Sequence, residues 1–131
     1  MSDAVTVLQY QDQSFSVSVP TKGVLLTYLF AVATIEEDSA RLAYMKSCME
    51  SQGSRSFFTD DDILRVSKSV REAESISHSS WAILKKQNAP DWIPEMVSKW
   101  VQSHTGVDRY DANLFFGRTS EKEASRERVA R

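Results

Sequence analysis

The sequence predicts a mainly α-helical protein with an N-terminal β-hairpin, a body of three to five helices and a charged C-terminal tail. Residues 24–35 form the longest apolar run and carry no charge, which is typical of a helix buried in a core or a partner interface. Proline and glycine are scarce, at 3 and 4 residues, which favours long regular elements over loops. The 131 residues suit one domain, which we place at 1–117, with the tail at 118–131.

Composition and charge exclude several function classes. The hydrophobic share of 41% and the charged share of 26% are typical of a soluble globular protein. The net charge of −2, without a dense Lys/Arg cluster before the tail, argues against a nucleic-acid partner. The apolar run, at about twelve residues, is shorter than the roughly twenty that span a bilayer. One cysteine, Cys48, excludes an intramolecular disulfide, and Met1 to Ala4 lack a secretory signal. We therefore expect a cytoplasmic protein with no membrane partner.

Residues 4–19 predict the β-hairpin. Apolar and polar residues alternate there with the two-residue period of a half-buried strand, and the apolar ones are Val5, Val7, Phe15, Val17 and Val19. Residues 11–13 suit the turn, and Pro20 ends the second strand because it lacks an N–H donor. An isolated hairpin is marginally stable in water, so we expect it to pack on the helices or on a second copy.

The central helix follows, with Thr21 as its expected N-cap. Apolar residues recur at spacings of three and four, at Leu25, Leu29, Val32, Ile35, Leu42, Met45 and Met49. Two interpretations stay open. In the first, a new helix starts at Thr34, because Thr34 and Glu37 match a capping box. In the second, one helix continues to Gln52 and the acidic residues lie on its solvent-exposed face. We place the break near Thr34 first, and Gly53 as the C-terminal stop.

The next helix opens at Thr59 and three aspartates, which suit the positive end of a helix dipole. A calcium loop would need ligands over twelve positions with a glycine, and none follows. Apolar positions then repeat to the end of the helix at 86 or 87, at Ile63, Val66, Val70, Ala73, Ile76, Trp81 and Leu84. Some 25 residues would make a rod of about 38 Å, part of which projects. Serines at 75–80 favour a kink.

The last ordered segments follow the break at 88–90. Asp91 is the expected cap of a further helix, with Pro94 in its first turn and Gly106 at its end. Its apolar stripe is Ile93, Met96, Val97, Trp100 and Val101. Asp111 suits the cap of one short turn before Gly117. The tail from 118 holds five basic and three acidic residues, so we expect it to be disordered when free.

Catalytic and cofactor motifs are missing from the sequence. His78 and His104 make no metal-ligand spacing, and the four glycines lie too far apart for a phosphate loop. Cys48 falls near an apolar stripe, where a structural thiol is the simpler interpretation. We therefore expect no cofactor, no metal and no enzyme. A small hydrolase stays a third interpretation, because a serine–histidine–acid triad is assembled in space.

The whole arrangement resembles the tail assembly chaperones of long-tailed (siphovirus) phages. The likeness is carried by Phe15, Val17, Val19 and Pro20 of the hairpin, by the helical segment 24–49, and by the charged end from Arg118. The resemblance implies a non-enzymatic chaperone of the host cytoplasm that coats the helical tape measure protein during tail assembly. It also implies a form extended by a programmed frameshift, which recruits the tail tube protein. Neither form would remain in the mature virion.

A binder of long amphipathic helices needs apolar grooves between its own helices. The candidate partner-binding residues are Leu25, Leu29, Val32, Met45, Met49, Trp92, Met96 and Trp100. Copies lying along one filament would touch each other, so weak homo-oligomers are expected. The alternative is a small helical regulatory or inhibitor protein that binds one protein partner one to one, using the same surfaces.

Overall fold

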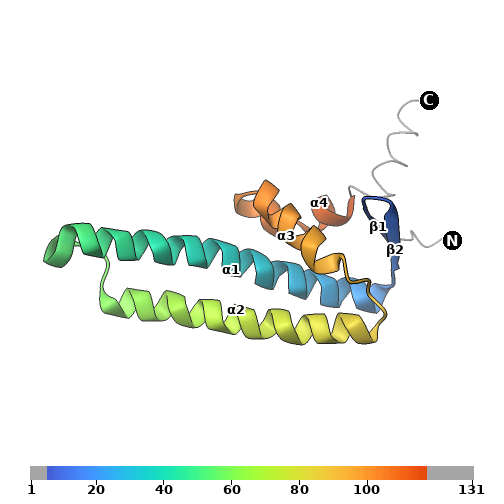
Figure 1. Ribbon diagram of the computed structural model, residues 1–131, viewed down its shortest axis with the longest axis horizontal. Helices are drawn as coiled ribbons and strands as arrows, with labels where there is room; N and C mark the ends of the chain where they lie inside the picture. The colour runs from blue at the N-terminus through green and yellow to red at the C-terminus, as the bar shows by residue number, and fades with distance from the viewer. Residues whose placement is uncertain (1–5, 118–131) are drawn as a thin grey trace, which may run out of the picture.

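A computed structural model describes residues 6–117 and confirms the mainly helical class with an N-terminal hairpin (Figure 1). The predictions for residues 1–5 and for the tail at 118–131 lie outside the described residues. In chain order the elements are β1 (Thr6–Tyr10), β2 (Gln13–Val17), α1 (Val19–Gln52), η1 (Gly53–Arg55), α2 (Asp60–Lys86), α3 (Ile93–Ser103), η2 (Gly106–Tyr110) and α4 (Ala112–Gly117).

Two long antiparallel helices, α1 and α2, set the elongated shape (Figure 1). The β-hairpin, α3, η2 and α4 gather at one end, around the first half of α1. We call this end the body. The two antiparallel helices α1 and α2 continue beyond η2, where they pack only on each other, and we call this part, residues 38–69, the arm. Its α1 portion is 15 residues long, about 22 Å at 1.5 Å per residue. The expected projecting rod is therefore present.

The β-hairpin packs on the helices, one of the two arrangements that the sequence predicts. Leu8 pairs with Phe15 and Thr6 with Val17 in an antiparallel register, and Gln11 takes a positive φ of 56° in the turn. Leu8 and Val17 are buried, and the Tyr10 ring stacks on Trp92 with centroids 5.8 Å apart. The second strand ends at Val17, two residues before the predicted end at Val19.

The start of α1 corrects the predicted cap. Ser18, not Thr21, is the N-cap, and its hydroxyl oxygen accepts a hydrogen bond of 3.4 Å from the Thr21 N–H. The physical reason is Pro20, whose fixed φ and missing N–H suit the first turn of a helix better than the end of a strand. Val19 therefore belongs to the helix, where it is 85% exposed.

The predicted break near Thr34 is wrong, because α1 is continuous from Val19 to Gln52. The acidic side chains in and next to the supposed capping box have other partners. Glu37 accepts a hydrogen bond of 2.9 Å from the Tyr110 hydroxyl of η2. Asp38 is buried against α2 and accepts a hydrogen bond of 2.6 Å from the Ser69 hydroxyl. Tertiary contacts thus override a local start signal. The predicted stop at Gly53 is confirmed, with φ at +56°.

The start of α2 is the predicted one. Thr59 and Asp62 form a capping box in which the Asp62 carboxylate accepts a 2.9 Å hydrogen bond from the Thr59 N–H. The serine-rich segment contains no break, because α2 is continuous to Lys86. Ser77 and Ser80 are buried in α2, and Ala73 is buried one turn before them. The serines therefore supply small side chains to a tight helix interface rather than a kink.

The predicted N-cap and the predicted C-terminal stop of α3 are both wrong. Trp92 is the N-cap in place of Asp91, because a turn held by the hydrogen bond from Ile93 N–H to Pro90 O delays the helix. The helix stops at Ser103, and Gly106 opens η2 instead with φ at +59°. Arg109 completes this end, since its Nε donates to the carbonyl oxygens of Val101 and His104. Pro94 does lie in the first turn.

The short helix α4 begins where the sequence predicts. Asp111 caps it, because the Leu114 N–H donates a 3.0 Å hydrogen bond to the Asp111 carboxylate. Phe115 and Phe116 of α4 are buried in the body.

The hydrophobic core lies in the body, where β1, α1, α3 and α4 meet the last turns of α2. Its most buried large side chains are Leu8, Leu25, Leu29, Leu84, Ile93, Val97 and Val101. Within residues 6–117, the stretch Val19–Arg55 is long and apolar enough by length and composition to cross a membrane, with a window of mean hydropathy 1.2. The core helix of a soluble protein passes the same test, and the absence of a membrane partner stays a prediction.

We predict that Thr59→Ala lowers the free energy of unfolding by about 1 kcal/mol, because the helix loses its N-cap acceptor. Urea unfolding followed by circular dichroism measures this change. The control is Ser75→Ala, an exposed position in α2, which should change the stability by less than about 0.5 kcal/mol. Equal effects from the two variants would contradict the capping role.

The capping box also predicts a pH dependence. The hydrogen bond from the Thr59 N–H, followed by that from its hydroxyl, holds the pKa of Asp62 below its ordinary 3.8. A lowered carboxyl pKa contributes stability above the ordinary value, and this contribution disappears as the pH falls through the lowered pKa. The stability difference between wild type and Asp62→Asn, whose amide does not titrate, should therefore shrink in that acidic window. A constant difference would contradict this coupling.

Candidate functional site

The structure places the predicted partner-binding residues mostly in the interior. Leu25 and Leu29 are 0% exposed, and the side chains of Met45, Met96 and Trp100 are also buried. Val32, Met49 and Trp92 are half-buried. The five buried side chains are out of reach of a partner in this conformation, and partner binding by the set stays a prediction. Exposed residues must therefore supply any site on the surface.

Trp100 belongs to an aromatic cluster of the body. Its ring stacks on His104 with centroids 4.0 Å apart, and Phe115 meets it edge-on at 5.2 Å. The His104 Nδ1 lies 2.8 Å from the Trp100 carbonyl oxygen, which fixes the imidazole at the end of α3. Trp100 Nε1 is buried without a hydrogen-bond partner in the described chain. The cluster is a packing unit rather than a catalytic one.

The apolar side chains of the arm are less deeply buried than those of the body. Of its residues, only Asp38 and Met45 are buried. The other apolar side chains that face the seam between the two helices stay half-buried: Leu42, Cys48, Met49, Phe58, Ile63 and Val66. In the arm α1 packs on α2 alone, whereas in the body α3 and η2 also pack on α1. The arm is thus an apolar surface without a cover in the described chain.

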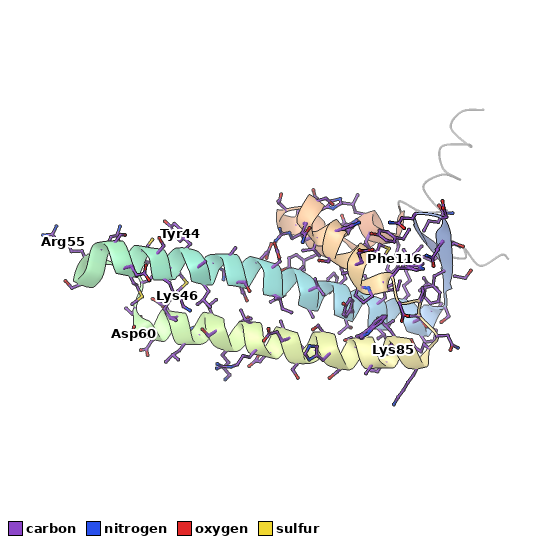
Figure 2. The ribbon with its side chains drawn as sticks, viewed as in Figure 1. Tyr44, Lys46, Arg55, Asp60, Lys85 and Phe116 are labelled. Atoms are coloured by element: carbon purple, nitrogen blue, oxygen red, sulfur yellow. The ribbon has the colours of Figure 1, made fainter. Side chains whose placement is uncertain are left out.

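The free end of the arm carries a cluster of aromatic rings. Phe58 meets Tyr44 edge-on with centroids 6.0 Å apart, and Phe57 meets Phe58 edge-on at 5.8 Å. Phe57 is 89% exposed and Tyr44 is 64% exposed. Figure 2 shows Tyr44 on this end of the molecule, far from Phe116 in the body. We call Tyr44, Phe57 and Phe58 the tip cluster.

Sequence reasoning did not select the tip cluster as a site. The only available signal was the pair of adjacent aromatic residues, Phe57 and Phe58, in the connector between two predicted helices. Tyr44 gave a weaker signal, because it breaks the three-four spacing of the apolar stripe of α1. Exposed aromatic residues in a short connector are a recurrent feature of interaction surfaces.

The arm is joined to the body by polar contacts at Glu37. This carboxylate accepts the hydrogen bond from Tyr110 and lies 3.7 Å from the Arg109 guanidinium. Burial is the main cause that raises the pKa of Tyr110, so its hydroxyl stays a donor at neutral pH. Because Arg109 also binds the end of α3, these contacts fix α3 and η2 against α1 at the point where the arm begins.

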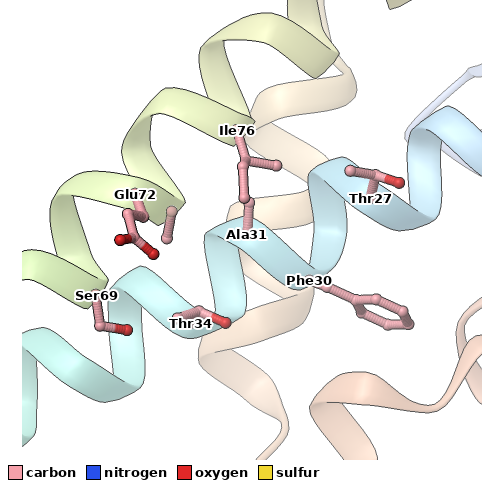
Figure 3. A pocket seen from close by; sticks show the side chains of 8 residues that line it. Thr27, Phe30, Ala31, Thr34, Ser69, Glu72 and Ile76 are labelled. Atoms are coloured by element: carbon pink, nitrogen blue, oxygen red, sulfur yellow. The ribbon is translucent and has the colours of Figure 1, made fainter.

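An open groove lies beside this junction, between α1 and α2 (Figure 3). Its volume is about 310 Å³. Phe30 and Ala31 line it from α1, and Ala73 and Ile76 from α2. Glu72 adds a carboxylate.

Residues 6–117 hold no group of three or more His, Cys, Asp or Glu side chains placed to bind a metal ion. His78 is exposed on α2, and Cys48 is a free, half-buried thiol on the arm. A hydrogen bond with this thiol raises the pKa of Tyr44.

Comparison of the chain with protein-family models, with curated proteins and with solved structures finds no significant match. The functional argument therefore depends on the arm, the tip cluster and the groove.

We predict that Trp100→Ala destabilises the folded chain by about 3–5 kcal/mol, because it empties a large buried site. Val107→Ala is the control, since Val107 is 84% exposed on the neighbouring η2. Urea unfolding and near-ultraviolet circular dichroism measure both variants. A Trp100→Ala protein as stable as wild type would show that Trp100 is not a core residue.

Proposed function

We propose that this chain is a non-enzymatic assembly chaperone that holds a long, helical protein along its arm. In a phage this protein would be the tape measure protein, and the chaperone would act in the host cytoplasm during tail morphogenesis. The observation that carries the proposal is the apolar seam of the arm, about 22 Å long, most of whose apolar side chains are half-buried. A helix from a partner would pack against this seam.

The chemistry of the arm supports a helical partner in particular. A seam between two helices accepts a third helix whose apolar residues are spaced three, four and seven apart. Met49 and Cys48 make the seam adaptable, because sulfur-containing side chains fill irregular gaps. The partner is thus recognised by the spacing of its apolar residues more than by the identity of each residue. Such tolerance is what a protein that coats a long helix requires.

Repeated binding along one filament would bring neighbouring copies into contact. Weak contacts between copies of the chain are therefore expected. The frameshifted form of the proposal would recruit the tail tube protein through its extension. That extension would begin near residues 118–131, outside the described residues.

The alternative function is a small regulatory or inhibitor protein that binds one protein partner one to one. The tip cluster favours it, because one compact group of aromatic rings is a sufficient anchor for a single pocket on a partner. Stoichiometry separates the two functions. A chaperone of this kind binds as many copies along one partner, and an inhibitor binds as one.

We predict a second, longer product from the same start codon. The gene is expressed with its native downstream nucleotides and an N-terminal tag, and the tag is detected by immunoblot. A minor larger band supports programmed frameshifting. The control is a gene whose final codons are changed synonymously, which should remove the larger band while leaving the protein unchanged. A single band in both genes would favour the one-to-one regulator.

We predict that Tyr44→Ser combined with Phe57→Ser weakens capture of the partner at least tenfold without unfolding the chain. Both side chains are exposed, so the stability should change by less than about 0.5 kcal/mol for each. The matched control is Val19→Ser combined with Val107→Ser, two residues of similar exposure on the body. The probe is the longest helical protein encoded by the same genome, co-expressed with the full chain.

Native mass spectrometry of the co-expressed complex then gives the stoichiometry. Several copies of the chain per partner are expected, and the tip variant should reduce their number while the body variant does not. A complex of one copy with one partner would contradict the chaperone function. Equal loss of capture in both variants would contradict the arm as the binding surface.

A further inference from the structure

The groove between α1 and α2 combines an apolar floor with one carboxylate. Ala31 of α1 faces Ala73 and Ile76 of α2 across it, and Figure 3 shows the Glu72 side chain directed into the space between the two helices. The hydroxyl-bearing Thr34 of α1 also lines it. A carboxylate beside apolar carbon is an unusual surface, because it offers charge and contact area to the same ligand.

The Glu72 carboxylate differs in its pairing from the carboxylates of Glu37 and Asp38 on α1. Glu37 is engaged by Tyr110 and Arg109, and Asp38 accepts a hydrogen bond from Ser69 and pairs with Arg41 at 3.5 Å. Glu72 has no hydrogen bond and no ion pair among residues 6–117. The adjacent cations of α2, Lys68 and Arg71, are exposed and do not pair with it. Its charge is thus available to a ligand.

The size of the groove limits the ligand. At about 310 Å³ and open to solvent, it lies at the lower end of the volumes that hold small molecules, about 300–1,000 Å³. It suits one long side chain better than a cofactor. A side chain with an apolar stem and a cationic head matches the floor and the carboxylate together.

Among cationic side chains, arginine fits the groove best. Its planar guanidinium binds a carboxylate through two parallel hydrogen bonds and still has donors for hydroxyl oxygens. Ser69 donates its own proton to Asp38, and Thr27 donates its proton to the Gly23 carbonyl oxygen, so both hydroxyl oxygens keep lone pairs that accept.

We propose that this groove binds an arginine side chain carried on the apolar face of a partner helix. The inference rests on the proposed function, since it assumes a helical partner. The surface beside the groove supports a helix, because Ile76 and Ile83 are 46% and 45% exposed and lie seven residues apart on α2. A helix laid along them would place apolar residues over the isoleucines and its arginine over Glu72.

The test uses the full chain and two synthetic helical peptides. The peptides share one sequence with leucines at every a and d heptad position, except for a single central position that is arginine in one and glutamine in the other. Fluorescence anisotropy measures their affinities. The arginine peptide should bind about tenfold more tightly, and Glu72→Gln should remove this advantage. Glu74→Gln, an exposed control on the same helix, should leave it unchanged.

Each other outcome overturns a distinct claim. If both peptides bind equally and Glu72→Gln changes neither, the arginine site is wrong while helix capture by the chain stands. If Glu74→Gln acts as strongly as Glu72→Gln, the preference is long-range charge attraction and the groove is not the site. If neither peptide binds the full chain, binding of helices of this pattern is wrong as well.

Discussion

The packing of α1 along α2 is the interaction on which the rest of the structure depends. It holds because α2 presents small side chains to α1, with Ala73, Ser77 and Ser80 all buried. One polar contact interrupts the apolar seam, where the Ser69 hydroxyl donates to the buried Asp38. A paired polar group inside such a seam fixes the register of two helices, because any shift would leave the carboxylate buried without its donor.

The body and the arm differ in what packs on α1 besides α2. In the body, α3 and η2 also pack on α1, and Glu37 marks the end of these contacts through its partners Tyr110 and Arg109. Beyond Glu37 the same two helices continue with most of their apolar residues half-buried. The fold therefore has its core at one end and leaves an apolar surface at the other. This division is the physical basis of the proposed chaperone function.

Local signals predicted much of the fold, and tertiary contacts decided the rest. The β-hairpin, the cap at Thr59 and the stop at Gly53 follow from turn and capping chemistry that the chain carries locally. The continuity of α1 through Thr34 does not, because it depends on Glu37 bonding to a residue 73 positions later. The sequence predicted that part of the helical rod projects, but not which of its apolar side chains stay uncovered. Periodicity marks an apolar stripe but not whether a third element covers it.

Hydrogen–deuterium exchange of the full chain, alone and bound to its helical partner, tests the central claim most directly. The account predicts that binding slows exchange in residues 38–69, where backbone amides of a two-helix arm open most easily, and changes the β-hairpin and α3 little. Slower exchange confined to the β-hairpin and α3, with the arm unchanged, would contradict the arm as the binding surface. The same measurement on the free chain tests whether α1 is one helix, because a break near Thr34 would exchange fast there.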